Sequence, residues 1–338
     1  MEILSARRRK AFAVGGLMLA VAICTMVLSL NTGTIWLSPI TIVQTLFGFG
    51  DADAAMVLFD YRLPRILVCA LAGIGLAVSG SILQGISRNS LADPGILGLH
   101  AGASCGLIVF ITFFRSLEDP LALFIPLFTF AGGTIAALLI FLLAYNRQTG
   151  LQPVRMILVG IAVTAGFSAI SLFFSLRLDE DTYSFTSRWL VGSVWGRDWE
   201  NVYALFPWVT IFTCYSLWRA RILDAFSLGD ERAIGIGVAL QRERLWLLLS
   251  AVALSSASVA MVGGVGFIGL VAPHLAKRLV GSTAKYQIPV AALIGLIILA
   301  AADMIGRTLF LPNSIPAGVI VAAVGAPYFL FLLVKAKS

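Results

Sequence analysis

Long stretches without a single charged residue dominate this sequence and restrict how the chain can fold. Five of them cover residues 66–86, 97–114, 121–144, 156–176 and 245–263. Each is close to the roughly 20 apolar residues that a helix needs to cross a bilayer. Hydrophobic residues make up 59% of the chain and charged residues 12%, and the mean hydropathy is +0.96. A soluble domain could not bury so much apolar surface, which excludes an ordinary cytosolic enzyme, a nucleic-acid binder and a disordered chain.

Extending this reading to every long apolar run predicts an all-α polytopic membrane protein. A single transmembrane domain over residues 1–338 would contain about ten transmembrane helices. These cover residues 11–30, 66–86, 97–114, 121–144, 156–176, 202–218, 245–263, 267–280, 286–305 and 315–334. The run 267–280 is short and holds Pro273 and His274, so a re-entrant or broken segment is the alternative there.

The distribution of basic residues orients the predicted spans. Ten spans place both termini on one side of the membrane. Of the 24 Lys and Arg residues, 17 then fall on the side of the termini and 7 on the other. Because cytoplasmic loops carry the excess of Lys and Arg, both termini are predicted to be cytoplasmic. The two long outer connections, 31–62 and 177–201, contain tryptophans such as Trp36 that suit the membrane interface.

The motifs of most catalytic and cofactor-binding proteins are missing. The four cysteines form no CxxC pair, so we expect no metal site and no disulfide framework. There is no P-loop, and the predicted spans hold few of the buried charges that proton- or sodium-coupled carriers need. Residues 264–269 match G-x-G-x-x-G but follow an apolar helix, which favours a helix break with close backbone packing. We therefore expect no cofactor on this chain and no covalent chemistry.

Four hydroxyl side chains follow one face of the predicted span 156–176. Thr164, Ser168, Ser171 and Ser175 are spaced by four, three and four residues, which places them on one side of a helix. Two interpretations remain open. The hydroxyls could serve helix packing and bonding to the preceding turn. They could also form the wall of a weakly polar translocation path, along which a bulky solute would slide without tight binding.

Several short motifs occur in a fixed order along the chain. They are Arg62-Leu63-Pro64-Arg65; Gln84-Gly85 followed by Arg88-Asn89-Ser90-Leu91-Ala92-Asp93-Pro94 and Leu97-Gly98; Ser227-Leu228-Gly229; Gly266-Phe267-Ile268-Gly269-Leu270-Val271-Ala272-Pro273-His274; and Gly325-Ala326-Pro327. In this combination the sequence resembles the FecCD-type permease subunits of ABC importers for ferric siderophores, haem and vitamin B12. The resemblance extends from about residue 15 to the C-terminus, and Ser90 stands where the family usually has Pro.

The resemblance implies a type II ABC importer permease that assembles with other chains. These partners would be a second permease subunit, identical or not, two ATPase subunits that carry ATP and Mg, and an extracytoplasmic substrate-binding protein. The path would follow the axis of the permease dimer in the cytoplasmic membrane of a bacterium. The implied cargo is an iron–siderophore complex, because residues 192–199 look like the outer loop of ferric-siderophore members. Haem or cobalamin is the alternative cargo, and a secondary transporter or channel is the rival class.

Three arginines carry the predicted docking of the binding protein. Arg62 and Arg65 precede the second span, with Pro64 at a plausible helix start, and by position alone they are interfacial anchors. The resemblance implies instead that they pair with acidic residues of the binding protein, and that Arg307 is a third such position. We expect three exposed guanidiniums able to bind carboxylates. Asp303 lies four residues before Arg307, and a simple pair between these two is the alternative for Arg307.

The segment 84–98 is expected to be a structural turn between two spans. Asp93, Pro94 and Gly95 favour a turn, and Arg88, Asn89 and Asp93 can satisfy loose backbone ends there. A direct contact with substrate is the alternative.

The loop 219–244 is the largest predicted cytoplasmic element. Residues 227–230 fit a helix start, Gly235 and Gly237 can end that helix, and a second short helix is expected near 238–243. The resemblance implies that this loop is the coupling element seated in a cleft of the ATPase. Its implied residues are Ser227, Leu228, Gly229, Asp230, Arg232 and Gly235. A solvated connector is the alternative.

Overall fold

The computed structural model describes residues 2–33, 37–95, 98–114, 125–146, 150–151, 153–309 and 314–336. Within these ranges the chain is mostly helical, which confirms the predicted all-α class. Its one pair of strands, β1 (Tyr145–Asn146) and β2 (Gly150–Leu151), is antiparallel. Trp36 and Leu97, which the sequence analysis singled out, lie outside the described residues.

Each predicted span corresponds to one helix. These helices are α1 (Glu2–Asn31), α4 (Leu63–Ser87), α5 (Leu99–Phe114), α6 (Ile125–Ala144), α7 (Pro153–Ser175), α9 (Trp199–Trp218), α12 (Leu240–Val262), α13 (Ile268–Val280), α14 (Ala284–Thr308) and α15 (Ala317–Ala336). In the described part of the chain, six helices are long and apolar enough to cross a membrane by length and composition. α5 and α13 are shorter than these six, and α13 has only 13 residues.

The two long connections contain helices that periodicity did not predict. The first holds α2 (Pro39–Leu46), α3 (Ala52–Ala55) and a π-helical turn, η1 (Met56–Arg62), which continues into α4. The second holds α8 (Glu180–Leu190). Local capping starts two of these short helices, because Ser38 accepts a hydrogen bond from the Thr41 amide and Asp179 accepts one from the Thr182 amide.

The core of the bundle forms where α4 packs against α12, α13 and α14. Close contact requires glycine here, because a Cβ added to Gly80 would overlap the carbonyl oxygen of Gly269 in α13. Gly73 of α4 faces the Gly295 backbone of α14 in the same way. Small residues at such crossings let helices of membrane proteins approach closely and gain van der Waals contact.

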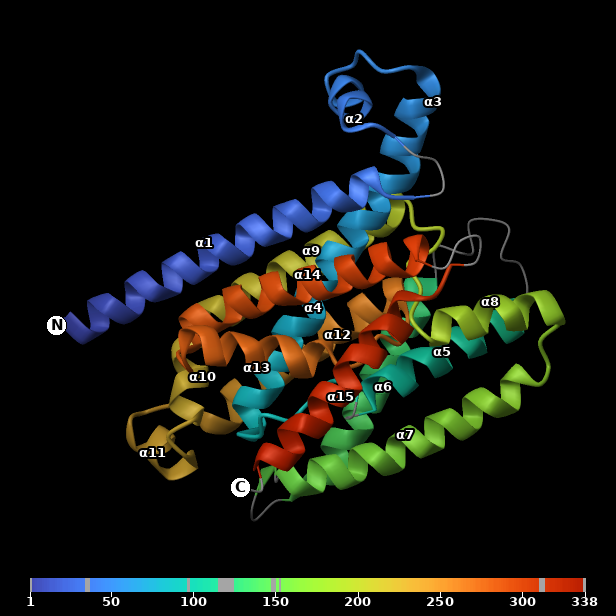
Figure 1. The fold of residues 1–338 in the computed structure, drawn as a ribbon. Coiled ribbons are helices and arrows are strands. Elements are labelled where there is room, and N and C mark those ends of the chain that lie inside the picture. The colour runs from blue at the N-terminus through green and yellow to red at the C-terminus, as the bar shows by residue number, and fades with distance from the viewer. Residues whose placement is uncertain are drawn as a thin grey trace.

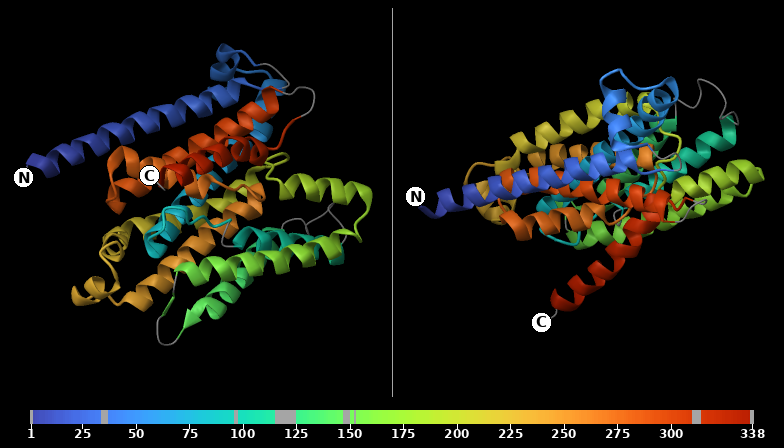
Figure 2. Two further views of the ribbon diagram at one scale, coloured as in Figure 1. Left: turned by 60° about the horizontal axis from the view of Figure 1, so that its bottom comes forward. Right: turned by 45° about the horizontal axis from the view of Figure 1, so that its top comes forward.

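The short helices lie at the two opposite ends of the bundle. Both chain ends lie toward the end that carries the short helices α10 (Ala220–Phe226) and α11 (Asp230–Gly235), while α2, α3 and α8 lie at the opposite end (Figure 1). We call these the α11 end and the α2 end. α7 lies along one side of the bundle and α1 along another, as the turned views also show (Figure 2).

Candidate functional site

The loop 219–244 folds into two short helices at the α11 end, and of these only α11 lies close to an expected position. α11 begins at Asp230 after Gly229, whose φ of 101° favours glycine, and it ends at Gly235 as predicted. Ser227 does not start this helix, since it ends α10 and its hydroxyl donates to the Asp224 carbonyl at 2.6 Å. The prediction of a second short helix near 238–243 is wrong, because α12 begins at Leu240 and includes most of that segment.

Asp230 joins α11 to two long helices. Its carboxylate accepts from Arg88, at the end of α4, at 2.5 Å and from Arg244, near the start of α12, at 3.0 Å. Arg244 is buried and its guanidinium also lies over the Phe226 ring of α10. The backbone of Arg88 has a φ of 53°, which ends α4 and directs the chain into the following turn. One carboxylate thus ties the loop to both α4 and α12.

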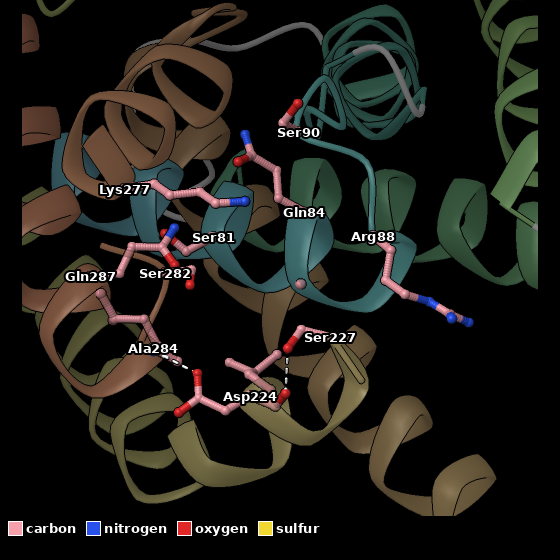
Figure 3. A pocket seen from close by; sticks show the side chains of 13 residues that line it. Ser81, Gln84, Arg88, Ser90, Asp224, Ser227, Lys277, Ser282, Ala284 and Gln287 are labelled. Carbon is pink, nitrogen blue, oxygen red and sulfur yellow. Dashed lines mark hydrogen bonds between the residues drawn. The ribbon is translucent and has the colours of Figure 1, made fainter. Parts of the chain in front are cut away.

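A polar cavity of about 310 Å³ is lined by residues of α10 and of the ends of α4, α13 and α14 (Figure 3). Gln84, Lys277 and Gln287 line it, while Arg88 extends away from the other labelled side chains (Figure 3). Asp224 of α10 accepts a hydrogen bond of 2.7 Å from the backbone amide of Ala284, the first residue of α14. Burial raises the pKa of Asp224, and this hydrogen bond partly offsets the rise. α10 is therefore attached to the N-terminus of α14.

The surface of the loop is apolar where α11 protrudes. Leu228, Ile234 and Ile236 are exposed, Ile236 to 64%. Arg232 and Gly235 are exposed beside them. The sequence analysis missed Ile234 and Ile236, because two isolated isoleucines in a charged loop gave no periodic signal. An exposed apolar cluster away from the bundle is typical of a protein interaction surface.

The segment that follows α4 is held by its own polar side chains, as expected. Asn89 accepts from the Leu91 amide at 2.9 Å, and Asp93 accepts from the Gly95 amide at 2.8 Å. Arg88 does not serve the local backbone and pairs with Asp230 instead. Pro94 packs against α13, since a Cβ added to Gly269 would lie 2.7 Å from the Pro94 Cδ.

The glycine-rich segment 263–266 breaks the helix, as the sequence predicts. α12 ends at Val262 and α13 starts at Ile268, with Phe267 in the left-handed region at a φ of 66°. Gly266 has open space around it, whereas Gly269 forms the close contact with α4. Pro273 lies inside α13 and His274 packs edge-on against Tyr328 of α15. Gly269 and His274 therefore lie in helix contacts, whereas Gly266 does not, and the structural role of this motif stays a prediction.

The three arginines predicted for docking gather at the α2 end, but they are not exposed. Arg62 is 6% exposed and donates to the Leu30 carbonyl of α1. Arg65 forms a two-pronged ion pair with the buried Asp303 of α14, at 2.7 Å from Nη2 and 3.0 Å from Nε. The expectation of three exposed guanidiniums is wrong, because the C-terminal end of α1 covers them and Asp303 binds Arg65. Their role in docking stays a prediction.

Arg307 completes this cluster. Its guanidinium donates to the Ser29 and Thr32 carbonyls at 2.5 Å each and lies 3.6 Å from Asp303. The Asp303–Arg307 pair considered from the sequence is therefore confirmed. The cluster links α1, α4 and α14 at the α2 end. Its charged hydrogen bonds satisfy the last carbonyl groups of α1.

The four hydroxyl residues of α7 lie in two different surroundings. Thr164 donates to the Gly160 carbonyl at 2.7 Å and lies against Gly98, which fits a packing role. Ser168, Ser171 and Ser175 line a cavity of about 320 Å³. α5 and α8 supply the rest of its lining, including Ser104, Thr186 and Ser187. We call this the serine cavity. Among the described residues no group of three His, Cys, Asp or Glu side chains could hold a metal ion.

The apolar helices, the close α4–α13 contact and the protruding α11 define a polytopic membrane permease. Residues 19–335 match the FecCD transport family. The chain belongs to this family, which confirms the resemblance drawn from its motifs.

Relatives and a solved structure match over almost the whole chain. It is 43% identical to the iron(3+)-hydroxamate import system permease protein FhuG of Bacillus subtilis, over 92% of this chain and 93% of the relative. It is 38% identical to the Fe(3+) dicitrate transport system permease protein FecD of Escherichia coli, over 94% and 97%. A metal-chelate type ABC transporter, solved in an inward-facing conformation, has 29% identity and a TM-score of 0.84, covering 96% of this chain and 99% of that one.

These matches and the six apolar helices confirm an integral membrane protein of the bacterial cytoplasmic membrane. The family is one of ABC transporter permease components, whose partner subunits bind ATP.

Proposed function

We propose that this chain is the permease subunit of an ABC importer that moves an iron–siderophore complex into the cytoplasm. The cargo is inferred from relatives named for iron(3+)-hydroxamate and Fe(3+)-citrate import. The observation that carries the transporter class is α11, a short helix with exposed Leu228, Ile234 and Ile236 that is tied to the bundle through Asp230. Energy would come from two ATPase subunits with ATP and Mg, and cargo from a binding protein.

In the proposed topology the ten long helices cross the membrane and both termini are cytoplasmic. Supporting this, the start of α1, the end of α15 and the loop with α10 and α11 lie at one end of the bundle (Figure 1). The excess of Lys and Arg falls on the same side. α13 is short for a full crossing, since 13 helical residues span about 20 Å. In this topology its flanking turns would complete the crossing.

We infer that α11 is the coupling helix and seats in a cleft of the ATPase. Its exposed isoleucines would supply apolar contact, and Glu231 and Arg232 polar contact, with the partner. A push on α11 would pass through Asp230 to Arg88 and Arg244, and so to α4 and α12. α10 would pass it to α14 through the hydrogen bond between Asp224 and Ala284.

Binding-protein docking is proposed for the α2 end. Arg65 retains 20% exposure of its side chain, so it can meet an acidic residue there, while Arg62 and Arg307 would act by fixing α1 beside it. A second permease subunit, identical or not, would pack beside α7, whose face is largely exposed. The serine cavity would then border the path between the two subunits.

The test is transport by the assembled importer in proteoliposomes. We expect uptake of an iron(III)–siderophore that requires the ATPase subunits, ATP and the binding protein. ATP must be supplied on the side of the liposome membrane where the ATPase subunits lie. Haem and cobalamin are the alternative cargoes, and each can be offered as a competitor in the same assay. Uptake by this chain alone, driven by a proton or sodium gradient, would contradict the proposal and favour a secondary transporter.

A further inference from the structure

A third cavity lies at the α2 end and plays no part in the sites described above. Its volume is about 290 Å³, and it lies between α8 and the segment 191–198 that follows it. We call it the arginine cavity. Its lining consists of Asp181, Ser184, Arg188, Trp189, Ser193, Trp195 and Arg197. The segment 192–199 is the one whose sequence looks like the outer loop of ferric-siderophore permeases, but the proposed mechanism has assigned it no task.

Hydrogen-bond donors in this lining lack acceptors. The buried Nε of Arg197 and the buried indole Nε1 of Trp189 have no hydrogen-bond partner in the described structure. The other contacts of the two arginines are long, at 3.5 Å from Arg197 to Asn201 and 3.4 Å from Arg188 to Ser184. Buried donors without acceptors are rare in native proteins and are costly. An acceptor from outside the chain would remove that cost.

The charge of the lining selects the kind of acceptor. Arg188 and Arg197 contribute two positive charges and Asp181 one negative charge to the lining. Asp198 acts electrostatically on Arg197, but neither arginine forms an ion pair with a described carboxylate. Burial lowers the pKa of Arg197 to about 10, so its guanidinium is still charged at neutral pH. Guanidinium and indole groups only donate, which suits a ligand rich in anionic oxygen atoms.

The position of the cavity suits entry into the transport path. α8 contributes Thr186 and Ser187 to the serine cavity and Arg188 and Trp189 to the arginine cavity, so one helix borders both. The segment 191–198 also contacts α15, because the Gly192 carbonyl accepts from the Gly318 amide at 2.9 Å. The two cavities therefore lie on the same helix, and the serine cavity holds the hydroxyls of α7.

We propose that the arginine cavity receives an anionic iron chelate at the outer mouth of the path, with Arg197 and Arg188 bonding to its oxygen atoms. This inference rests on the proposed function for its cargo class and goes beyond it by naming the charge of the cargo and the residues that select it. It predicts a preference for anionic over neutral chelates that the four hydroxyl residues of α7 alone would not give.

The experiment uses the complete importer with its ATPase and binding protein in nanodiscs and proteoliposomes. The probes are iron(III)–citrate, which is anionic, and a neutral iron(III)–trihydroxamate complex. Arg197→Gln removes the charge and Arg197→Lys keeps it. Arg177→Gln is the matched control, because Arg177 is exposed at the same end and lies over the Phe173 ring rather than in the cavity. Binding to the permease is read by tryptophan quenching, and transport by KM and kcat.

We expect Arg197→Gln to weaken iron(III)–citrate binding and raise its KM by about tenfold or more, the effect of one charged hydrogen bond. Arg197→Lys should recover most of this loss, and the neutral complex and Arg177→Gln should change little. Equal effects on both chelates, or none, would overturn the inference. So would weaker binding of the substrate-binding protein alone, since a protein carboxylate would then fill the site. If the wild-type importer moves no iron chelate, the proposed function fails, and tryptophan quenching still decides the cavity.

Discussion

Arg65 of α4 and Asp303 of α14 form a two-pronged ion pair between two core helices at the α2 end of the bundle. The carboxylate is 3% exposed and also lies 3.6 Å from Arg307, so it is the common partner of two cations. Removing one partner of a buried pair leaves an uncompensated charge, which costs more than the pair itself contributes.

Asp303→Ala should therefore destabilise the protein. We expect a loss of about 3–5 kcal/mol in the free energy of unfolding, because Arg65 and Arg307 would both lose their counter-charge. Thermal unfolding in detergent measures it. Asp60→Asn is the control, as Asp60 is exposed at the same end of the bundle. Equal unfolding midpoints for Asp303→Ala and the wild type would contradict this account of the cluster.

Exchanging the two charges separates packing from docking. Arg65→Asp with Asp303→Arg keeps the pair but moves the guanidinium to α14. We expect much of the stability to return relative to Arg65→Asp alone, whereas affinity for the binding protein and its salt dependence stay reduced. Binding is measured by surface plasmon resonance at two salt concentrations. Full recovery of affinity in the exchanged variant would show that Arg65 only holds the helices together.

Asp230→Ala should uncouple ATP hydrolysis from transport while the protein stays folded. The Asp230 side chain is 39% exposed, so its pair with the exposed Arg88 contributes little to stability. The buried Arg244 loses its carboxylate, and we therefore expect a total cost of about 1–3 kcal/mol. Their mechanical role would be lost, because α11 would no longer hold Arg88 and Arg244. ATPase activity and uptake are measured together, with Arg278→Ala as control, because Arg278 is exposed near the end of α13 and lies outside the coupling loop. Normal coupling in Asp230→Ala would count against transmission through this residue.

Gly229→Pro should disturb the start of α11 and also uncouple the transporter. Proline fixes φ near −65°, whereas Gly229 has a φ of 101°, so the turn before α11 cannot keep its shape. Gly15→Ala in α1 meets no neighbouring atom, lies outside the coupling loop and serves as the control. The ratio of ATP hydrolysed to cargo moved gives the result, and an unchanged ratio in Gly229→Pro would exclude α11 as the coupling helix.

Gly80→Ala should separate α4 from α13. The added Cβ would overlap the Gly269 carbonyl oxygen, and we expect a loss of about 1–3 kcal/mol from the forced shift. Gly166→Ala in α7 is the matched control, because nothing lies within 4 Å of its added Cβ. Thermal unfolding in detergent compares the two variants. If the unfolding midpoint of Gly80→Ala is no lower than that of Gly166→Ala, α4 and α13 can move apart without loss of stability.

The positions of the long helices could be predicted from the sequence, because they depend on long apolar runs. Contacts between residues far apart in the chain could not. Apolar runs located the ten long helices because a span must be apolar along its whole length. The burial of Arg62 and Arg307 was missed, since it depends on the end of α1, far away in the sequence. Asp230 was singled out as a helix start, but its partners Arg88 and Arg244 come from two other helices.

α14 starts at Ala284, whose amide is held by Asp224, and near its far end Asp303 holds Arg65. A helix of 25 residues is about 37 Å long, so α14 joins the two ends of the bundle. Tilting it at the α11 end must move its other end, and with it the arginines gathered there. A nucleotide-driven displacement inside the cell could in this way loosen the grip on a delivery protein outside, without any separate signal crossing the bilayer.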